Sequence, residues 1–412
     1  MKKIYKTIKK CRGCGNKNLS KIYYNRPSPI GEAFLKKKDL EIITNKLYPL
    51  NLVICNKCKL CQLDIVVNPD ILYKDYLYLT STSFELLTHF KNTSKLLISK
   101  LKLKNTSKVL EIGSNDGSLL NYFKAKGFDV LGIEPAKPAS KISRSKGIKT
   151  LNNFFDKKLV KNLGHKLRSY ELIIANNVFA NIDQINEWFR LIKIILSENG
   201  SFVFESSYLA DILFNNVFDF IYHEHLSYFT ITSVNNLCKK NGLILFDVDH
   251  ISTKGGSIRY YITKNTNKKI NKKVTIFLKK EKDNKLFHKS TFNKLKEKIN
   301  NEKIKLNNFV KNNSDKNIIG FGASISCITL IYEFGLENKF KFLIDDNNIK
   351  QNKYSPGSNI KILNPKKNKL SKNDIILILP WRYQKMILKK HKKTLNKADK
   401  IVQVWPKFRI LK

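Results

Sequence analysis

The segment YHEHLSY, residues 222–228, holds two histidines, one acid and two tyrosines in a short stretch. A histidine whose pKa lies near neutrality can remove a proton from carbon, while a tyrosine or carboxylate beside it orients the ring or holds developing charge. If the segment were helical, His223 and His225 would point about 200° apart, so one metal ion could not readily bind both. The sequence therefore favours acid–base chemistry over a metal site. The alternative is an aromatic segment that packs in a core.

Cysteine spacing near the amino terminus indicates a separate metal site. The motifs CRGCG (11–15) and CNKCKLC (55–61) contain two C-x-x-C pairs separated by a long loop. This spacing is typical of a tetrahedral zinc site, and the expected ligands are Cys11, Cys14, Cys55 and Cys58. Four thiolates leave no open position for water, so we expect the zinc ion to be structural. Cys61 is either a reserve ligand or a small core residue.

The chain from 107 to 136 predicts a cofactor-binding β-loop-α-β unit. An apolar run ends in the glycine loop GSNDG, a helical segment follows, and a second apolar run ends at Glu134. Glycines allow close backbone approach to a ligand, and an acid after the second strand can accept hydrogen bonds from ribose hydroxyls. The loop lacks the G-x-G-x-x-G of dinucleotide binders and the lysine of a P-loop, which favours S-adenosylmethionine. The expected cofactor contacts are Gly113, Ser114, Asn115, Asp116, Gly117, Glu134 and, after the strand expected at 170–175, Asn176 and Asn177. A turn that binds no ligand is the alternative.

Further strands are expected at 201–205, 243–248 and 257–263, with helices between several of them, as in an α/β sheet. Residues 316–347 repeat the order of apolar run, glycine loop, helix, apolar run and acid, which indicates an internal duplication. Backbone N–H groups at the start of the second helix would form an anion site, and the residues after the acid could contact a diphosphate and a base. The expected substrate contacts here are Gly322, Ala323, Ser324, Asp345, Lys353 and Tyr354. The alternative is a domain that only packs.

Composition bounds the class of protein. The 412 residues include 77 Lys and Arg against 33 Asp and Glu, a formal net charge of +44. Because the lysines are scattered along the whole length, the charge indicates a solvated surface more than a nucleic-acid site. No apolar run reaches the roughly 18 residues of a membrane span, and MKKIYKTIKK leads into a cysteine motif rather than a signal segment. We expect a cytoplasmic protein without membrane insertion.

Four sections are expected along the chain. They are a zinc-binding domain at 1–70, a cofactor-binding domain at 71–265, a linker of one or two helices at 266–312 and a Rossmann-like domain at 313–412. The linker is rich in Lys and Asn and carries apolar residues at helical spacing.

Taken in order, the four-cysteine knot, LEIGSNDG (110–117), GIEPA (132–136), NNVFA (176–180), YHEHLSYF (222–229) and GGSIRYY (255–261) resemble the nucleotide-sugar C-methyltransferases of deoxysugar biosynthesis. The similarity runs from residue 11 to about 405. It implies an α/β fold class in which a small zinc-binding domain precedes a class I methyltransferase Rossmann-like domain and a second Rossmann-like domain. It also implies methyl transfer from S-adenosyl-L-methionine to carbon 3 of a 4-keto sugar linked to a nucleoside diphosphate.

The resemblance assigns roles to individual residues. It implies that His225 is the base, that Tyr222 and Glu224 assist it, and that Tyr76 and Tyr78 belong to a tyrosine-rich segment at the active site. Arg259, within GGSIRYY, is expected to contact the substrate.

Two positions depart from the family pattern. Asn181 stands where a histidine is common, and an asparagine can hydrogen-bond but cannot carry a proton. Lys254 stands where another histidine is frequent.

Other functions compete with this one. Methyl transfer to oxygen or nitrogen of a nucleotide sugar needs no ketone, and a relative could deprotonate the sugar and act as an epimerase without S-adenosylmethionine. The net charge leaves open a zinc protein that binds or modifies RNA. The expected partner is a nucleotide sugar with no specific nucleic acid, and the expected state is a monomer or weak oligomer.

Overall fold

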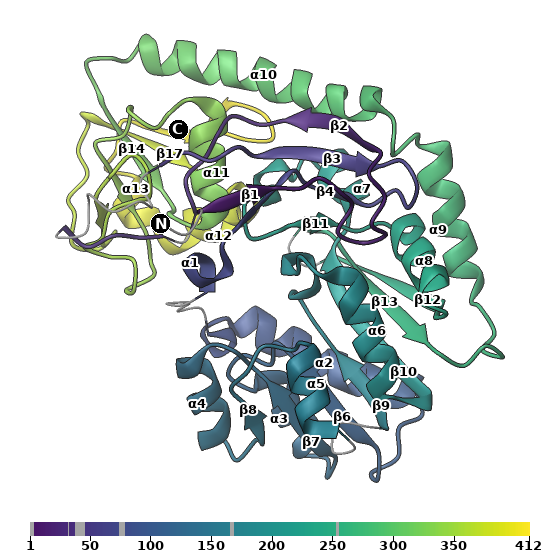
Figure 1. Cartoon of the computed structure of the whole chain (residues 1–412). Helices are drawn as coiled ribbons and strands as arrows, with labels where there is room; N and C mark the ends of the chain where they lie inside the picture. The colour runs from purple at the N-terminus through teal and green to yellow at the C-terminus, as the bar shows by residue number, and fades with distance from the viewer. Residues whose placement is uncertain (1–3, 32, 38–45, 74–78, 165–168, 253–254) are drawn as a thin grey trace.

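The computed structural model describes residues 4–31, 33–37, 46–73, 79–164, 169–252 and 255–412. In Figure 1 the seven-stranded central sheet and its helices lie at the bottom, the amino-terminal strands lie at the top, and the carboxy-terminal α/β unit lies at the left. Tyr76, Tyr78 and Lys254 lie outside the described residues.

The central sheet is mostly parallel. Its strands lie in the order β12 (Ile244–Ile251), β13 (Ser257–Thr263), β10 (Leu196–Ser207), β9 (Tyr170–Ile174), β6 (Lys108–Ile112), β7 (Asp129–Ile133) and β8 (Thr150–Leu151). β13 is antiparallel to both of its neighbours, and the strands from β10 to β8 are parallel. Chain order reverses between β6 and β9, and ligands of open α/β sheets bind at the carboxyl ends of strands at such a point.

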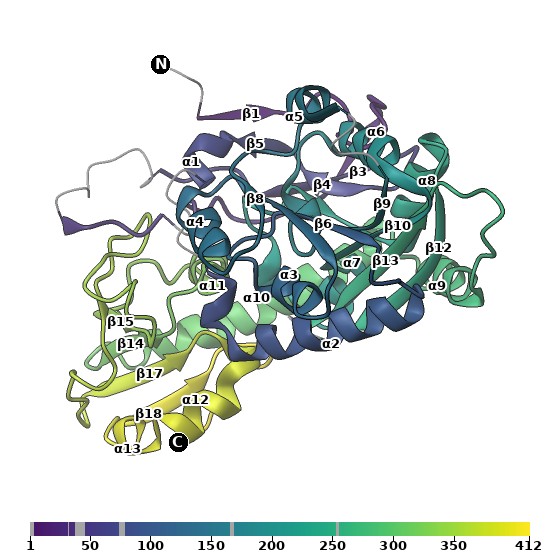
Figure 2. The same ribbon diagram turned by 90° about the horizontal axis from the view of Figure 1, so that it is seen from below.

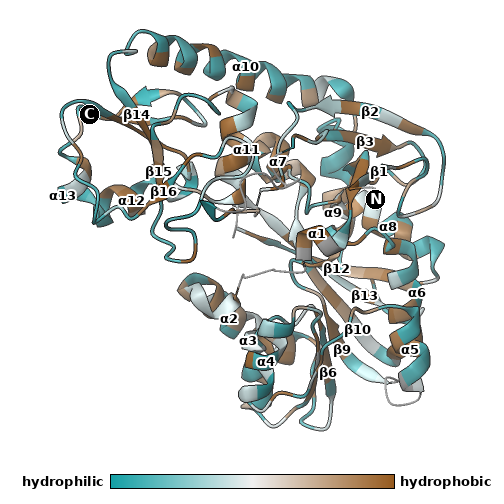
Figure 3. Ribbon diagram, turned by 60° about the vertical axis from the view of Figure 1, so that its left-hand side comes forward, coloured by the Kyte–Doolittle hydropathy of each residue, from teal (hydrophilic) through white to brown (hydrophobic). Residues whose placement is uncertain are grey.

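Helices cover both faces of this sheet, which explains why its strands read as continuous apolar runs. Alternate residues of β9 point to opposite faces: Leu172 and Ile174 pack in one core with Phe90 and Phe123, and Ile173 packs in another with Trp188. Figure 3 shows the strands in the brown of hydrophobic residues. The helices of this part are α2 (Phe84–Lys100), α3 (Ser118–Lys124), α4 (Lys137–Ser145), α5 (Lys157–Leu163), α6 (Ile185–Ile195) and α8 (Ile231–Lys240).

The amino-terminal region forms a four-stranded antiparallel sheet. Its order is β11 (Ser227–Tyr228), β4 (Cys61–Leu63), β3 (Asn51–Cys55) and β2 (Leu19–Tyr24). A second ribbon pairs β1 (Tyr5–Thr7) with β5 (Ile65–Val67), and α1 (Pro69–Tyr73) follows. The strand β11 comes from the YHEHLSY segment, so the candidate catalytic segment ends inside the amino-terminal sheet.

The carboxy-terminal unit is a second α/β sheet, in the order β16 (Ile362–Leu363), β15 (Phe342–Ile344), β14 (Asn317–Phe321), β17 (Asp374–Ile378), β18 (Lys400–Gln403) and β19 (Arg409–Ile410). All pairs are parallel except β18 with β19. Its helices are α11 (Ile325–Phe334), α12 (Gln384–Lys390) and α13 (Lys392–Leu395). Figure 2 shows β14, β17 and β18 on the opposite side of the molecule from β12. The second Rossmann-like sheet predicted from the duplication is confirmed.

Two helices join the central and carboxy-terminal sheets, α9 (Lys272–Asp283) and α10 (Lys289–Lys311), as the linker pattern predicts. The helix α10 buries one stripe that includes Phe292, Leu295 and Ile299. This stripe shares a core with Leu52 of β3 and Ile331 of α11. One apolar core extends across the predicted domain boundaries, so packing does not show where one domain ends and the next begins. The boundaries therefore stay predictions. Within the described residues, no helix has both the length and the apolar composition needed to span a bilayer.

Candidate active site and metal centre

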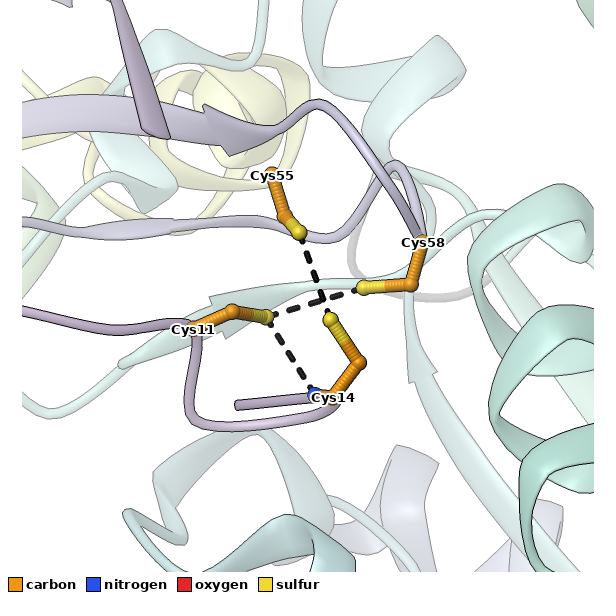
Figure 4. Close-up of side chains that lie close together, drawn as sticks. All are labelled: Cys11, Cys14, Cys55 and Cys58. Atoms are coloured by element: carbon orange, nitrogen blue, oxygen red, sulfur yellow. Dashed lines mark hydrogen bonds between the residues drawn. The ribbon is translucent and has the colours of Figure 1, made fainter. Parts of the chain in front are cut away.

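The four predicted cysteine ligands converge on one point (Figure 4). Their sulfur atoms all lie within 4.8 Å of one another, with Cys11 to Cys58 at 3.6 Å and Cys14 to Cys55 at 3.4 Å. Ligands about 2.3 Å from a tetrahedral zinc ion would lie about 3.8 Å apart, so the donor set fits Zn²⁺. The predicted ligand set is confirmed as a cluster.

Cys61, the reserve ligand, is not part of this cluster. It is fully buried in β4 and packs in the core shared by the amino- and carboxy-terminal units. Burial raises the pKa of its thiol, as expected for an apolar surrounding. Cys61 is therefore a core residue.

Arg12 connects the metal centre to the candidate active site. It stands between the first two ligands, and its side chain is 1% exposed. Its Nη1 donates hydrogen bonds to the carbonyl oxygens of Leu63 and Leu226, both at 2.8 Å. Its Nη2 donates to the Ile65 carbonyl at 3.2 Å, and its Nε donates to Oδ1 of Asp183 at 3.2 Å. Leu226 directly follows the YHEH motif, and Asp183 follows the NNVFAN segment, so one guanidinium joins both segments to the zinc knuckle.

The YHEH motif lies in a loop between η6 (Phe218–Phe220) and β11. Nδ1 of His225 lies 3.1 Å from the Phe220 carbonyl oxygen, and Nε2 lies 3.0 Å from the Tyr222 hydroxyl. A carbonyl oxygen only accepts, so Nδ1 carries a proton and Nε2 of the neutral ring accepts the tyrosine proton. Glu224, which directly precedes His225 in the chain, is buried. The predicted residues Tyr222 and His225 are therefore brought together, with a defined tautomer.

His223 faces the other way. It is 2% exposed, its Nε2 donates to the Pro49 carbonyl at 3.1 Å, and its ring packs edge-on against Tyr48. Burial lowers the pKa of His223 to about 4, because nothing nearby compensates the charged form fully. It is a neutral core histidine.

The carboxy-terminal unit holds the same segment from a second side. Asp219 in η6 is 1% exposed, and its Oδ1 accepts a 2.8 Å hydrogen bond from Nη1 of Arg382. Its Oδ2 accepts from the Trp381 indole at 3.2 Å. Both donors belong to η8 (Trp381–Tyr383), and the Arg382 guanidinium lies 4.5 Å from the centroid of the Phe220 ring. Two units thus fix the position of the YHEH loop.

The predicted cofactor loop follows β6 at the switch point of the sheet. Gly113 and Gly117 have φ angles of 72° and 73°, in the region that favours glycine. A Cβ at Gly113 would lie 2.4 Å from Val178, so the loop has no room for a side chain there. The Asn115 and Asp116 side chains accept hydrogen bonds from the backbone of Thr80 and Ser81, both at 2.9 Å. They therefore hold η3 (Thr80–Thr82) against the loop.

Glu134 braces the loop from the neighbouring strand. Its Oε2 accepts from the Asn115 backbone at 2.9 Å and its Oε1 accepts from the Ala136 backbone at 2.7 Å. Burial raises the pKa of Glu134, although these two bonds oppose the shift. A carboxylate has about four lone-pair sites, so two remain for ligand hydroxyls.

Several buried polar atoms around this loop have no hydrogen-bond partner among the described residues. They are Oγ of Ser114, both amide atoms of Asn176 and Oε2 of Glu111. Buried polar atoms normally find partners, so this edge of the sheet fits a polar ligand such as S-adenosylmethionine. Glu111 did not stand out in the sequence, because an acid inside an apolar run reads as part of the strand. Asn177 has a φ of 56° and donates its backbone N–H to the Glu205 carbonyl at 2.8 Å.

The second glycine loop repeats the bracing seen in the first. Asp345, after β15, accepts from the backbone N–H of Ala323 at 2.7 Å and from that of Asn347 at 2.8 Å. Glu134 makes the equivalent pair of bonds, so the duplication extends to the acid's role. One backbone donor predicted for a diphosphate is thus already bonded to Asp345. Ser324 caps α11, where its side chain accepts from the Cys327 backbone at 3.4 Å.

The other predicted substrate contacts occupy different surroundings. Tyr354 exchanges backbone hydrogen bonds with Leu35, which joins this loop to the amino-terminal region, and Lys353 is half-buried beside it. Gly322 has a φ of 101° and no room for a side chain beside Pro380. Substrate contact at these positions stays a prediction.

Arg259, one of the expected substrate contacts, lies in a charged cluster beside the cofactor edge whose other members, His89 and Glu205, were missed by sequence reasoning. Its contact with the substrate stays a prediction. Arg259 is 2% exposed, and its Nη2 donates to Glu205 at 2.9 Å and to Thr93 at 2.7 Å. Both oxygens of Glu205 lie 3.0 Å from Nε2 of His89. His89 and Glu205 line a cavity of about 460 Å³ together with Asn177, Ser252, Arg382 and Tyr383. The residues of this cluster are far apart in the chain, so no local sequence motif predicts that they meet.

Three family models match the chain. A putative zinc-binding domain matches residues 11–73, a methyltransferase domain matches residues 82–247, and a C-methyltransferase C-terminal domain matches residues 252–406. A curated relative, the C-methyltransferase NovU of Streptomyces niveus, is 27% identical over 415 residues, covering 100% of this chain and 99% of the relative.

Solved methyltransferase structures resemble part of the chain. A S-adenosylmethionine-dependent methyltransferase from Clostridium acetobutylicum is 14% identical, with a TM-score of 0.36, over 43% of this chain and 92% of that one. Magnesium protoporphyrin IX methyltransferase from Synechocystis, with bound S-adenosylhomocysteine, is 11% identical, with a TM-score of 0.35, over 44% of this chain and 87% of that one. With the three domains in the order of the family models, the chain belongs to the S-adenosyl-L-methionine-dependent C-methyltransferases that combine an amino-terminal zinc-binding domain, a central methyltransferase domain and a C-methyltransferase carboxy-terminal domain.

Proposed function

We propose that this C-methyltransferase acts on a 4-keto deoxysugar linked to a nucleoside diphosphate and methylates it at carbon 3. The observation that carries the proposal is the Tyr222–His225 pair, in which Nδ1 of the imidazole donates to a carbonyl and Nε2 is the basic atom. A carbon atom becomes a nucleophile only after it loses a proton, and an adjacent ketone makes that loss feasible by taking the charge onto oxygen. An imidazole with a defined basic nitrogen suits this task.

The proposed steps use the residues as follows. His225 takes the C3 proton on Nε2, while Tyr222 moves its hydrogen bond toward the sugar. Bound S-adenosylmethionine supplies an electrophilic methyl group. The cofactor edge, at Glu134 and Asn176, and the YHEH loop together hold the two reactants in one orientation, which supplies much of the rate acceleration.

The sugar nucleotide is proposed to extend toward the carboxy-terminal unit. Support comes from η8, whose Arg382 both lines the cavity and binds the YHEH segment through Asp219. The half-buried Lys353 and the hydroxyl of Ser324 are the proposed diphosphate contacts, since Asp345 already takes the Ala323 backbone donor.

The test uses purified protein, S-adenosylmethionine and a panel of 4-keto nucleotide sugars. We expect a product heavier by one methylene, and we expect deuterium from D₂O to enter C3 without the methyl donor. His225→Asn should lower kcat by about 10²–10⁴-fold, because the base is lost while cofactor binding is kept. A methyl group found on oxygen, or unchanged turnover in His225→Asn, would contradict the proposal.

A further inference from the structure

The cavity beside the cofactor edge contains an imidazole that the proposed mechanism does not yet use. His89, on α2, lines this cavity, which lies between the carboxyl ends of β9 and β10 and the η8 segment of the carboxy-terminal unit. Its side chain is 13% exposed, so it is held in place yet reachable from the cavity.

The surroundings of His89 define its hydrogen-bonding state. Glu205 is 3% exposed and also binds the buried Arg259. Burial opposes ionisation of Glu205, but the hydrogen bond from His89 and the charge of Arg259 outweigh it and lower its pKa. An ionised carboxylate only accepts, so Nε2 of His89 must donate. Nδ1 has no hydrogen-bond partner within the part of the chain that the structure describes.

We propose that His89 is a second proton-carrying residue of the active site, and that its Nδ1–H binds the carbonyl oxygen of the ketosugar as that oxygen becomes an enolate. This inference rests on the proposed function. A carboxylate behind an imidazole fixes the orientation of the ring and directs Nδ1 away from Glu205. The proposed role takes the ring as the imidazolium, in which Nδ1 also donates. A donor placed where negative charge develops contributes more than one that binds the ground state.

With these two imidazoles, every proton and electron pair in the proposed methyl transfer is accounted for. Nε2 of His225 takes the C3 proton, and the electron pair of the broken C–H bond moves onto the carbonyl oxygen, beside Nδ1–H of His89. When C3 forms its bond to the methyl group, the carbonyl reforms, and the electron pair of the broken methyl–sulfur bond stays on sulfur. His89 ends with the proton with which it began, and His225 releases its proton to water.

His225 is not among the residues that line the cavity, but Arg382 and Phe220 connect the cavity to it. Arg382 lines the cavity beside His89 and stacks on the Phe220 ring, and the Phe220 carbonyl accepts from His225. The proposal therefore requires a substrate that extends from the cavity past Arg382, so that it lies between the proton acceptor on the YHEH loop and the donor on α2.

The test compares two substitutions of His89 that replace different nitrogens. The amide of asparagine reaches the position of Nδ1, while the amide of glutamine reaches that of Nε2. We expect His89→Gln to lower both kcat and C3 deuterium exchange by about 10²–10³-fold, the cost of losing one donor to a developing oxyanion. His89→Asn should retain clearly more of both rates, and the affinity for S-adenosylmethionine should not change in either variant.

A purely structural histidine predicts the reverse order, because His89→Gln keeps the bond to Glu205. That order, or near wild-type rates in His89→Gln, would overturn the role of His89. Wild-type protein that neither methylates nor exchanges any sugar of the panel would instead overturn the proposed function. His250→Gln is the matched control: His250 also pairs with a carboxylate, that of Asp211 at 2.7 Å, but it does not line the cavity. Its rates should equal those of wild type.

Discussion

At the scale of single residues, one motif contains two histidines with opposite surroundings. His223 is sealed in the core against Pro49, while His225 is partly exposed and bonded to Tyr222. The residues are two apart in the chain, and the loop turns their side chains to different sides. Side-chain type therefore identified this motif, but burial separates a structural imidazole from a reactive one.

The pH dependence of stability tests this separation. The unfolded chain binds a proton at His223 near pH 6.5, whereas the folded chain binds it only near pH 4. The unfolded state therefore binds more protons between these values, and stability falls by up to about 3 kcal/mol as the pH drops from 6.5 to 4. His223→Gln can keep the hydrogen bond to Pro49 and should remove this part of the acid sensitivity. Urea unfolding at a series of pH values measures it, and equal acid sensitivity in both proteins would refute the assignment.

At the scale of elements, the candidate catalytic loop is held in place by contacts with two other units of the chain. β11 adds to the edge of the amino-terminal sheet through β4, and η6 is bonded to η8. Arg12 adds a third attachment through the Leu226 carbonyl. Because the loop has little regular structure of its own, its geometry depends on these partners.

Arg12→Lys tests that dependence. An ammonium group keeps the charge but cannot reach three carbonyl oxygens and Asp183 at once. We expect stability to fall by about 3 kcal/mol in thermal unfolding, since buried partners lose their donors. We also expect kcat to fall by about tenfold, a loss of positioning, with zinc content unchanged.

Lys6→Ala is the control for Arg12→Lys. Lys6 is the exposed partner of the same Asp183, at 2.9 Å, and a surface pair contributes at most about 1 kcal/mol. A kcat for Arg12→Lys equal to that of Lys6→Ala would show that the guanidinium does not position the loop.

At the scale of the whole molecule, the amino-terminal strands, α7 (Leu209–Phe214), α10 and the carboxy-terminal sheet share one apolar core. The zinc knot lies at the border of this core and that of the central sheet, since Cys11, Cys55 and Cys58 pack in the latter. Loss of zinc should therefore disturb more than a local loop.

Substitution of single cysteines tests this view. Cys58→Ala removes a ligand and should abolish tight zinc binding, lower the melting temperature and reduce turnover together. Cys61→Ala removes a buried thiol that is close to Cys58 in the chain but is not a ligand. This variant should keep one zinc per chain, and the small cavity should lower its stability modestly. Zinc content by elemental analysis, with thermal unfolding, compares the two, and zinc loss in Cys61→Ala would overturn the assignment of ligands.

Local spacing made much of this protein predictable. Patterns of neighbouring residues predict the two C-x-x-C pairs, the two β-loop-α-β units and the amphipathic linker. The structure contains all of them. The glycine loop of the first unit and Glu134 also lie together, where the Asn115 backbone donates to the Glu134 carboxylate. Such features follow from turn geometry and hydrophobic periodicity, which act over a few residues.

Only the tertiary structure decided which of these separate parts contact one another. It placed β11 in the zinc-binding sheet, made Arg12 a link between three segments, gave Asp345 the backbone donor predicted for a diphosphate, and brought His89 to Glu205, 116 residues away. These contacts depend on how separate elements pack, and a charged residue in a helix or strand reads the same whether its partner is water or a buried carboxylate. The sequence determined the parts and their order along the chain, while long-range packing determined which polar groups meet, because burial selects those pairs only after the sheets have assembled.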